Sequence, residues 1–120
     1  MSLEADVYEL ERRVANLERE LNRLERQEQH LREQHELVVS RQQAVRAQNG
    51  SRKQYLELDR QNEALTEEIV NIIHSEVVVD DILQMHRRDL VRLRRYQTRL
   101  KRSLMRSGMN CQKLGKDARV

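Results

Sequence analysis

Few residues of this chain have the types and the spacing that catalysis or metal binding would require. His30 and His35 stand five residues apart in the segment HLREQH, roughly 140° apart around a helix. Two helical ligands of one metal ion stand four residues apart, so this pair cannot chelate a metal. The sequence has no glycine-rich phosphate loop and no nucleophile elbow, and Cys111 is its single cysteine. We therefore expect a protein that is not an enzyme and that has no cofactor and no metal site.

The strongest chemical signal is a basic segment, HRRDLVRLRRYQTRLKRSLMR, at residues 86–106. Residues 1–85 hold 11 basic and 18 acidic side chains, whereas residues 86–120 hold 12 basic and 2 acidic ones. This asymmetry indicates a basic contact segment on an otherwise acidic chain. The expected contact residues are Arg87, Arg88, Arg92, Arg94, Arg95, Arg99, Lys101, Arg102 and Arg106.

Four interpretations of the basic segment stay open. It could contact an acidic protein surface, bind nucleic-acid phosphates, lie on an anionic membrane, or be a solvated face that balances the acidic first half. Nucleic-acid binding is less expected because Tyr96 is the only aromatic residue among the basic ones. Membrane binding is less expected because the leucines of the segment continue a coiled-coil pattern. The sequence therefore favours an acidic protein partner.

The composition predicts the elements that carry these residues. The chain has no proline, tryptophan or phenylalanine, its aromatic content is 2%, and 36% of its residues are charged. A compact core normally uses aromatic side chains, so this composition predicts an all-α protein of long helices or coiled coil.

Two heptad tracts support this prediction. The first runs from Leu3 to Val45 and the second from Tyr55 to Leu104, each with alternating spacings of three and four residues. We call these positions the seam. We expect its polar residues to set register and partner choice at some cost in stability. The residues with this expected role are Glu28, His35, Asn62, Glu76 and Gln97. Gln42 and His86 are further polar positions of the seam.

The two tracts are out of phase at the segment QNGS. Asn49 and Gly50 tolerate left-handed backbone, and Ser51 can cap a new helix. We expect helix one over 3–47, a turn over 48–52 and helix two over 53–106, where Gly108 ends the helix. Residues 1–106 would form one helical unit, and residues 107–120 a flexible basic tail. The alternative is a continuous rod with a skip at Gly50.

Pairing favours a turn over a rod. If the chain folds back about residue 50, Leu10 lies opposite Leu90, and Leu17 lies opposite Leu83. The same register brings Glu4 near Arg94 and Glu11 near Arg87, whereas a parallel homodimer would pair several like charges. We therefore expect an antiparallel helical hairpin.

Helix two has more apolar residues in its middle than one seam can use. Ile73, Val77, Val78 and Ile82 widen the apolar stripe, which argues for further helices packing there. We expect a multi-helix bundle with copies of the chain or with other coiled-coil proteins. The residues expected to serve oligomer or partner contacts are Leu10, Leu17, Leu24, Leu31, Leu65, Ile69, Ile72, Ile73, Val78, Ile82, Leu83 and Leu90.

The segment VDDILQMHRRDLVRL, residues 79–93, resembles the late helix of the snapin family of small coiled-coil subunits. The residues that carry the resemblance are Val79, Asp80, Asp81, Ile82, Leu83, Gln84, Leu90, Arg92 and Leu93. The resemblance implies only that the chain works as a non-catalytic subunit of helical assemblies.

These observations together predict a scaffold, adaptor or tethering subunit that acts by helix–helix association and has a basic contact segment. The alternative is a binder of nucleic acid or anionic membranes through residues 86–106. An acidic N-terminus, a lone cysteine and the lack of a long apolar run favour a cytoplasmic or nuclear location without secretion or a membrane span.

Overall fold

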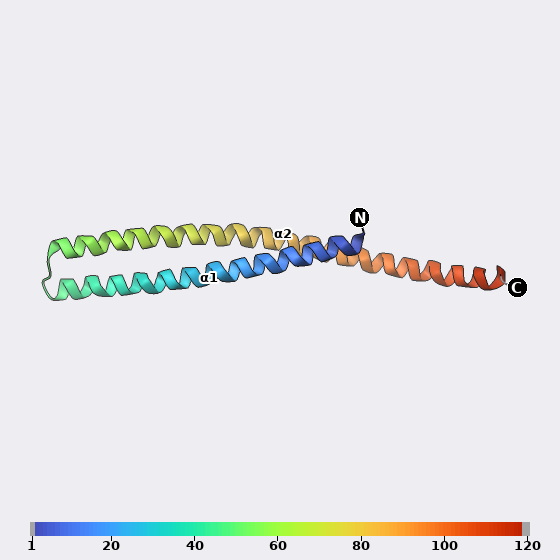
Figure 1. The fold of residues 1–120 in the computed structure, drawn as a ribbon, viewed down its shortest axis with the longest axis horizontal. Coiled ribbons are helices and arrows are strands. Elements are labelled where there is room, and N and C mark those ends of the chain that lie inside the picture. Colours follow the sequence, from blue (N-terminus) through green and yellow to red (C-terminus); the bar gives the residue numbers. More distant parts are fainter. Residues whose placement is uncertain (1, 119–120) are drawn as a thin grey trace. The chain divides into compact units, whose positions relative to one another are not determined.

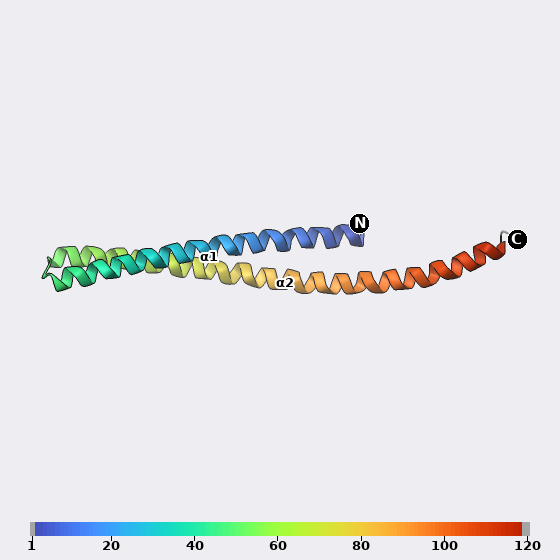
Figure 2. The same cartoon turned by 90° about the horizontal axis from the view of Figure 1, so that it is seen from below.

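The chain folds into two long helices that pack against each other. In a computed structural model, which describes the backbone of residues 2–118 and side chains as far as residue 107, α1 spans Leu3–Ala47 and α2 spans Arg52–Ala118. No strand occurs within residues 2–118. A short turn joins the helices, which run back along each other (Figure 1; Figure 2). The expected antiparallel helical hairpin is therefore confirmed, and the continuous rod is excluded.

The contacts divide the chain into two parts. The turn part consists of residues 16–83 and includes the turn. The terminal part combines residues 2–15 of the N-terminal segment with α2 from residue 84 onward. Each part contains a stretch of α1 beside a stretch of α2.

Local signals in the sequence explain where α1 begins and why it persists. The backbone N–H of Ala5 donates to Oγ of Ser2 at 3.1 Å, which caps the helix start. Glu4 and Asp6 place negative charge in the first turn, where the helix dipole favours it. Ion pairs one turn apart, such as Arg32 Nε to Glu28 Oε2 at 2.7 Å, add support along the helix.

The turn is built from a left-handed cap at the end of α1. Asn49 adopts φ 52°, and its N–H donates to the carbonyl of Arg46 at 3.3 Å. The N–H of Gly50 donates to the carbonyl of Val45 at 2.7 Å. These two bonds satisfy carbonyl groups that a helix end leaves open. The left-handed residue is thus Asn49, whereas Gly50 has no positive φ.

Gly50 serves a close approach instead. A Cβ added at this position would lie 2.7 Å from Cγ1 of Val45 and 3.1 Å from its carbonyl oxygen. Ser51 then starts α2, because the N–H of Gln54 donates to its Oγ at 3.1 Å. The expected turn residues therefore have three different roles.

The far end of α2 differs from the expected boundary. Helix two was expected to end near Arg106, but the backbone stays helical to Ala118 and passes through Gly108. A glycine inside a helix costs only about 1 kcal/mol, and no proline follows to end the helix. The start also differs by one residue, since α2 begins at Arg52.

Candidate interaction surfaces

The seam residues are the ones that the hairpin buries. From Leu3 to Val45 on α1, and from Tyr55 to Gln97 on α2, every seam position is buried or half-buried. Leu83 is only 1% exposed. Beyond this range, Leu100 and Leu104 are exposed. The heptad spacing therefore predicted which face of each helix is buried.

The twelve residues expected at partner contacts divide into two groups. Ten of them are buried or half-buried along α1 and α2: Leu10, Leu17, Leu24, Leu31, Leu65, Ile69, Ile72, Ile73, Leu83 and Leu90. Val78 and Ile82 are exposed, so they are the two that remain available to another chain.

Contacts between the helices fix the antiparallel arrangement within each part. In the turn part, Nη2 of Arg46 lies 3.3 Å from the hydroxyl of Tyr55, and the guanidinium stands 5.4 Å from the ring centre. In the terminal part, Nη2 of Arg94 lies 3.1 Å from Oε1 of Glu11. Arg94 was expected near Glu4 instead.

The direction of the side chains explains this offset. A helical side chain leans toward the N-terminus of its own helix. In an antiparallel pair, side chains of the two helices therefore lean in opposite directions along the pair. Two side chains can then meet although their Cα atoms lie at different heights along it. Glu11 and Arg94 therefore meet between their backbone levels, and each has a partner seven residues, or about two turns, away from the expected one.

One polar layer of the seam holds a hydrogen-bonded amide pair. Nδ2 of Asn62 donates to Oε1 of Gln42 at 2.5 Å, and Gln42 is 9% exposed. Nε2 of Gln42 and Oδ1 of Asn62 are buried without a partner. The pair is therefore only partly satisfied, and it costs stability relative to an apolar layer.

A second polar layer joins two carboxyl groups. Burial raises the pKa of Glu76, and the hydrogen bond to Glu28 and its charge raise it further. The hydrogen bond from Arg32 lowers the pKa of Glu28. Glu76 is thus the member of the pair that retains a proton more readily, while Glu28 stays ionised.

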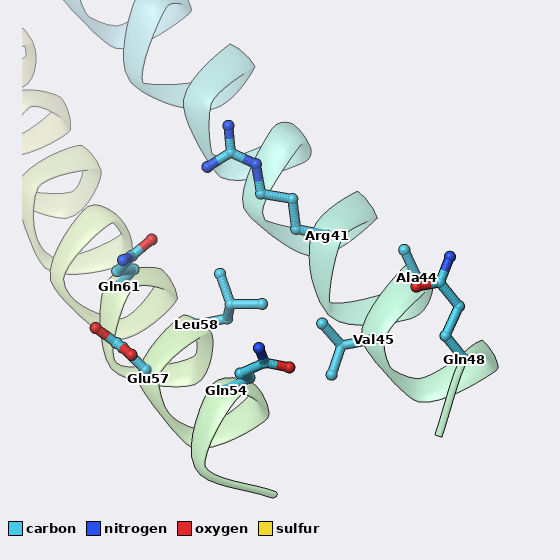
Figure 3. Close-up of a pocket in the computed structure, with 8 residues that line it drawn as sticks. All are labelled: Arg41, Ala44, Val45, Gln48, Gln54, Glu57, Leu58 and Gln61. Carbon is cyan, nitrogen blue, oxygen red and sulfur yellow. The ribbon is translucent and has the colours of Figure 1, made fainter. Parts of the chain in front are cut away.

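A hollow lies between the helices beside the turn (Figure 3). Val45 and Leu58 point toward each other there, and Arg41 and Gln61 stand further along the same side. Arg41 and Gln61 also line the next hollow, which includes the exposed Leu37. This side is shallow and is lined mainly by amide and aliphatic groups.

The outer face of α2 carries exposed apolar side chains. Val77 and Val78 are 54% and 57% exposed, Val70 is 46% exposed, and Met85 is 51% exposed. None of these four residues belongs to the seam. Val77 and Val78 were singled out in the sequence, but Val70 and Met85 were missed. Helical spacing of apolar residues on the side opposite the heptad seam was the signal that could have found them.

All nine expected basic contact residues are exposed: Arg87, Arg88, Arg92, Arg94, Arg95, Arg99, Lys101, Arg102 and Arg106. Arg95, Arg99 and Arg102 line one side of α2 together with Val91 and Thr98. Arg94 lines the same side while it also pairs with Glu11. The segment can present a row of guanidinium groups to a negatively charged surface.

Two kinds of site are not found in the part of the chain that the structure describes. That part has no group of three or more His, Cys, Asp or Glu side chains placed to hold a metal ion. None of its helical segments has the length and apolarity that crossing a bilayer requires. The side chain of Cys111 lies outside the described residues.

Comparisons with known proteins return no match: no family model, no curated protein and no solved structure is significantly similar to the chain.

Proposed function

We propose that the chain is a non-catalytic scaffold, adaptor or tethering subunit that works by helix–helix association. The observation that carries this proposal is the outer face of α2, where Val70, Val77 and Val78 remain about half exposed in the hairpin. A two-helix hairpin buries only one side of each helix. Apolar side chains on the opposite side favour a further helix, because their burial against it removes apolar area from water.

The polar seam layers support the same proposal. The amide pair of Gln42 and Asn62 and the carboxyl pair of Glu28 and Glu76 lower the stability that the seam could reach. Polar groups of this kind are best attested as devices that select register and partner in coiled coils.

The basic segment would give the assembly a contact for an acidic protein surface. Its exposed arginines carry planar groups with several N–H donors, which suit carboxylates. A second candidate function uses the same residues, since Arg95, Arg99 and Arg102 line one side of α2. In that case the protein would bind nucleic acid or an anionic membrane.

Direct binding measurements separate the two candidates. The chain is titrated against a labelled DNA duplex and against vesicles with and without phosphatidylserine, at low and at physiological salt. A scaffold should show only weak, non-specific binding that is lost at physiological salt. Tight binding to either probe at physiological salt would overturn the proposal and favour the second candidate. A variant with Arg95, Arg99 and Arg102 changed to Gln identifies the surface responsible.

A further inference from the structure

The seam of α2 continues past the residues of α1 that could cover it. In the terminal part, α2 runs on beyond the first residues of α1 (Figure 1). Leu90 is 6% exposed beside α1, whereas Leu100 is 40% exposed and Leu104 is 61% exposed. These two leucines keep the heptad spacing of the buried seam. Their exposure therefore follows from the end of α1 and not from a change in the sequence pattern.

Tyr96 joins the two leucines in one exposed apolar row. Measured at 100° per residue, five of residues 93–107 lie within about 40° of the direction of Leu100. They are Leu93, Tyr96, Leu100, Leu104 and Ser107. Leu93 is half-buried, whereas Tyr96 is 58% exposed. We call Tyr96, Leu100 and Leu104 the end row.

Basic side chains flank the end row on both sides. Arg99 and Arg106 lie about 100–120° from its centre on one side, and Lys101 lies about 100° away on the other. Arg94 stands on the same side as Lys101 but pairs with Glu11 of α1. The other three are exposed and have no hydrogen-bond or ion-pair partner among the residues whose side chains the structure describes. No Asp or Glu occurs in the sequence of residues 90–107, so no negative side chain balances these charges locally.

We propose that the end row binds an amphipathic helix of another protein, whose apolar stripe is flanked on both sides by glutamate or aspartate. The end row continues an interface that already joins two helices. A helix lying in the line of α1 would therefore meet apolar side chains at the same heptad spacing. The charged residues on the flanks are all basic, so the carboxylates of such a helix would pair with guanidinium and ammonium groups.

The pattern of the end row argues against other occupants. Two end rows facing each other would place basic flanks against basic flanks in either orientation. A membrane surface favours a broad apolar face, but the residues about 60° from Leu100 are the polar Gln97 and Ser103. Nucleic-acid phosphates would leave the end row exposed to water. A narrow apolar row with polar borders is typical of a contact between two helices.

This inference rests on the proposed function, because it names the chemistry of one partner in the same kind of helical assembly. The two can nevertheless fail separately. The end row lies in the terminal part, whereas the exposed valines that carry the proposed function, Val70, Val77 and Val78, lie in the turn part. A chain without a functional end row would keep the association through those valines.

A designed peptide tests the chemistry of the partner. The probe is a fluorescent helical peptide of about three heptads with Leu at positions a and d and Glu at positions e and g. It is titrated with the full chain at physiological salt, and binding is followed by fluorescence anisotropy. The glutamate peptide should bind at least about tenfold more tightly than the same peptide with Lys in place of Glu. No binding of the glutamate peptide, or equal binding of both peptides, would overturn the proposal.

Substitutions in the end row locate the contact. Leu100→Gln combined with Leu104→Gln should weaken binding of the glutamate peptide by at least about tenfold. Val78→Gln is the matched control, because Val78 is 57% exposed in the turn part, and it should leave binding unchanged. Circular dichroism checks that both variants keep their helix content. Weaker binding by Val78→Gln alone would move the contact to the outer face of α2, which would overturn this inference and keep the proposed function.

Charge reversal tests the flanks. Arg99→Glu combined with Lys101→Glu should remove the preference for the glutamate peptide over the lysine peptide. Arg52→Glu combined with Arg60→Glu changes the net charge equally at exposed positions of the turn part and should keep that preference. An equal loss in both variants would assign the preference to overall charge and overturn the proposal.

Vesicles that contain phosphatidylserine test the remaining occupant. The proposal expects the unmodified chain and the variant with Leu100→Gln and Leu104→Gln to bind these vesicles equally weakly at physiological salt. Tight binding that this variant loses would assign the end row to a membrane surface and contradict the proposal.

Discussion

Asn62 on α2 and Gln42 on α1 share one hydrogen bond in the seam, and each leaves a second polar group without a partner. Nδ2 of Asn62 donates this bond to Oε1 of Gln42, and the two atoms are 2.5 Å apart. Nε2 of Gln42 and Oδ1 of Asn62 are buried and unpaired. The hairpin therefore contains a layer whose contribution to stability depends on both residues being polar or both being apolar.

Replacing one member of this pair should cost more than replacing both. Gln42→Leu leaves Asn62 with no partner at all and should lower the free energy of unfolding by about 1 kcal/mol. Gln42→Leu combined with Asn62→Leu should match or exceed the stability of the unmodified chain. Urea unfolding of the single and double variants gives the coupling. Strictly additive losses in the two single variants would show that the bond has no effect on stability.

Glu76 should make stability depend on pH. Its pKa is raised above the ordinary value of 4.5, chiefly by burial and then by Glu28, so the folded chain holds a proton that the unfolded chain releases. The contribution is full below pH 4.5 and is lost as the pH rises through the folded pKa. Glu28 has a lowered pKa and acts in the opposite direction. The stability that Glu28 contributes is fully present above its ordinary pKa of 4.5 and is lost as the pH falls through its lowered pKa.

Glu76→Gln isolates the first of these effects. The amide resembles the protonated carboxyl group, so the variant should unfold at a higher temperature than the unmodified chain at neutral pH and at nearly the same temperature below pH 4.5. Thermal unfolding followed by circular dichroism at both pH values makes the comparison. An equal difference between the two chains at both pH values would exclude titration of Glu76 as the cause.

The turn should respond in opposite ways at two neighbouring positions. Gly50→Ala adds a Cβ within 2.7 Å of Val45 and should destabilise the hairpin by about 1–3 kcal/mol. Asn49→Gly relieves a left-handed residue and should stabilise the hairpin by up to about 1 kcal/mol. Chemical unfolding measures both variants. A stabilising Gly50→Ala would mean that the close approach to Val45 is absent in solution.

Leu83 should be the most sensitive apolar position of the seam. It is the one described residue with a large side chain that is fully buried, so Leu83→Ala should cost about 2–4 kcal/mol. Leu37→Ala, at an exposed position on α1, is the matched control and should change the free energy of unfolding by less than about 0.5 kcal/mol. Similar losses for both variants would contradict the assignment of the inner face.

The buried inner face of each helix was predictable because it depends only on the heptad spacing of apolar residues. A spacing of three and four residues places Leu24, Val38, Leu83 and Leu90 on one side of each helix, and all four are buried. The turn was predictable because Asn49 and Gly50 interrupt that period. The length of α2 was not, since Gly108 is a weak signal that a helix can absorb at small cost.

Contacts between side chains were harder to predict than the faces that carry them. Arg94 pairs with Glu11 rather than with Glu4, because both side chains lean toward their own N-termini. The outer face was only half recognised. Val77 and Val78 are adjacent and easy to notice, whereas Val70 and Met85 become significant only on a helix whose opposite side is already occupied.

The most direct test of helix–helix association is the mass of the unmodified chain in solution. Sedimentation equilibrium at physiological salt, over a wide range of protein concentration, should show a species of twice the 14.4 kDa of one chain. The mass should fall toward that of one chain on dilution. A mass of one chain at every concentration would contradict helix–helix association between copies of the chain.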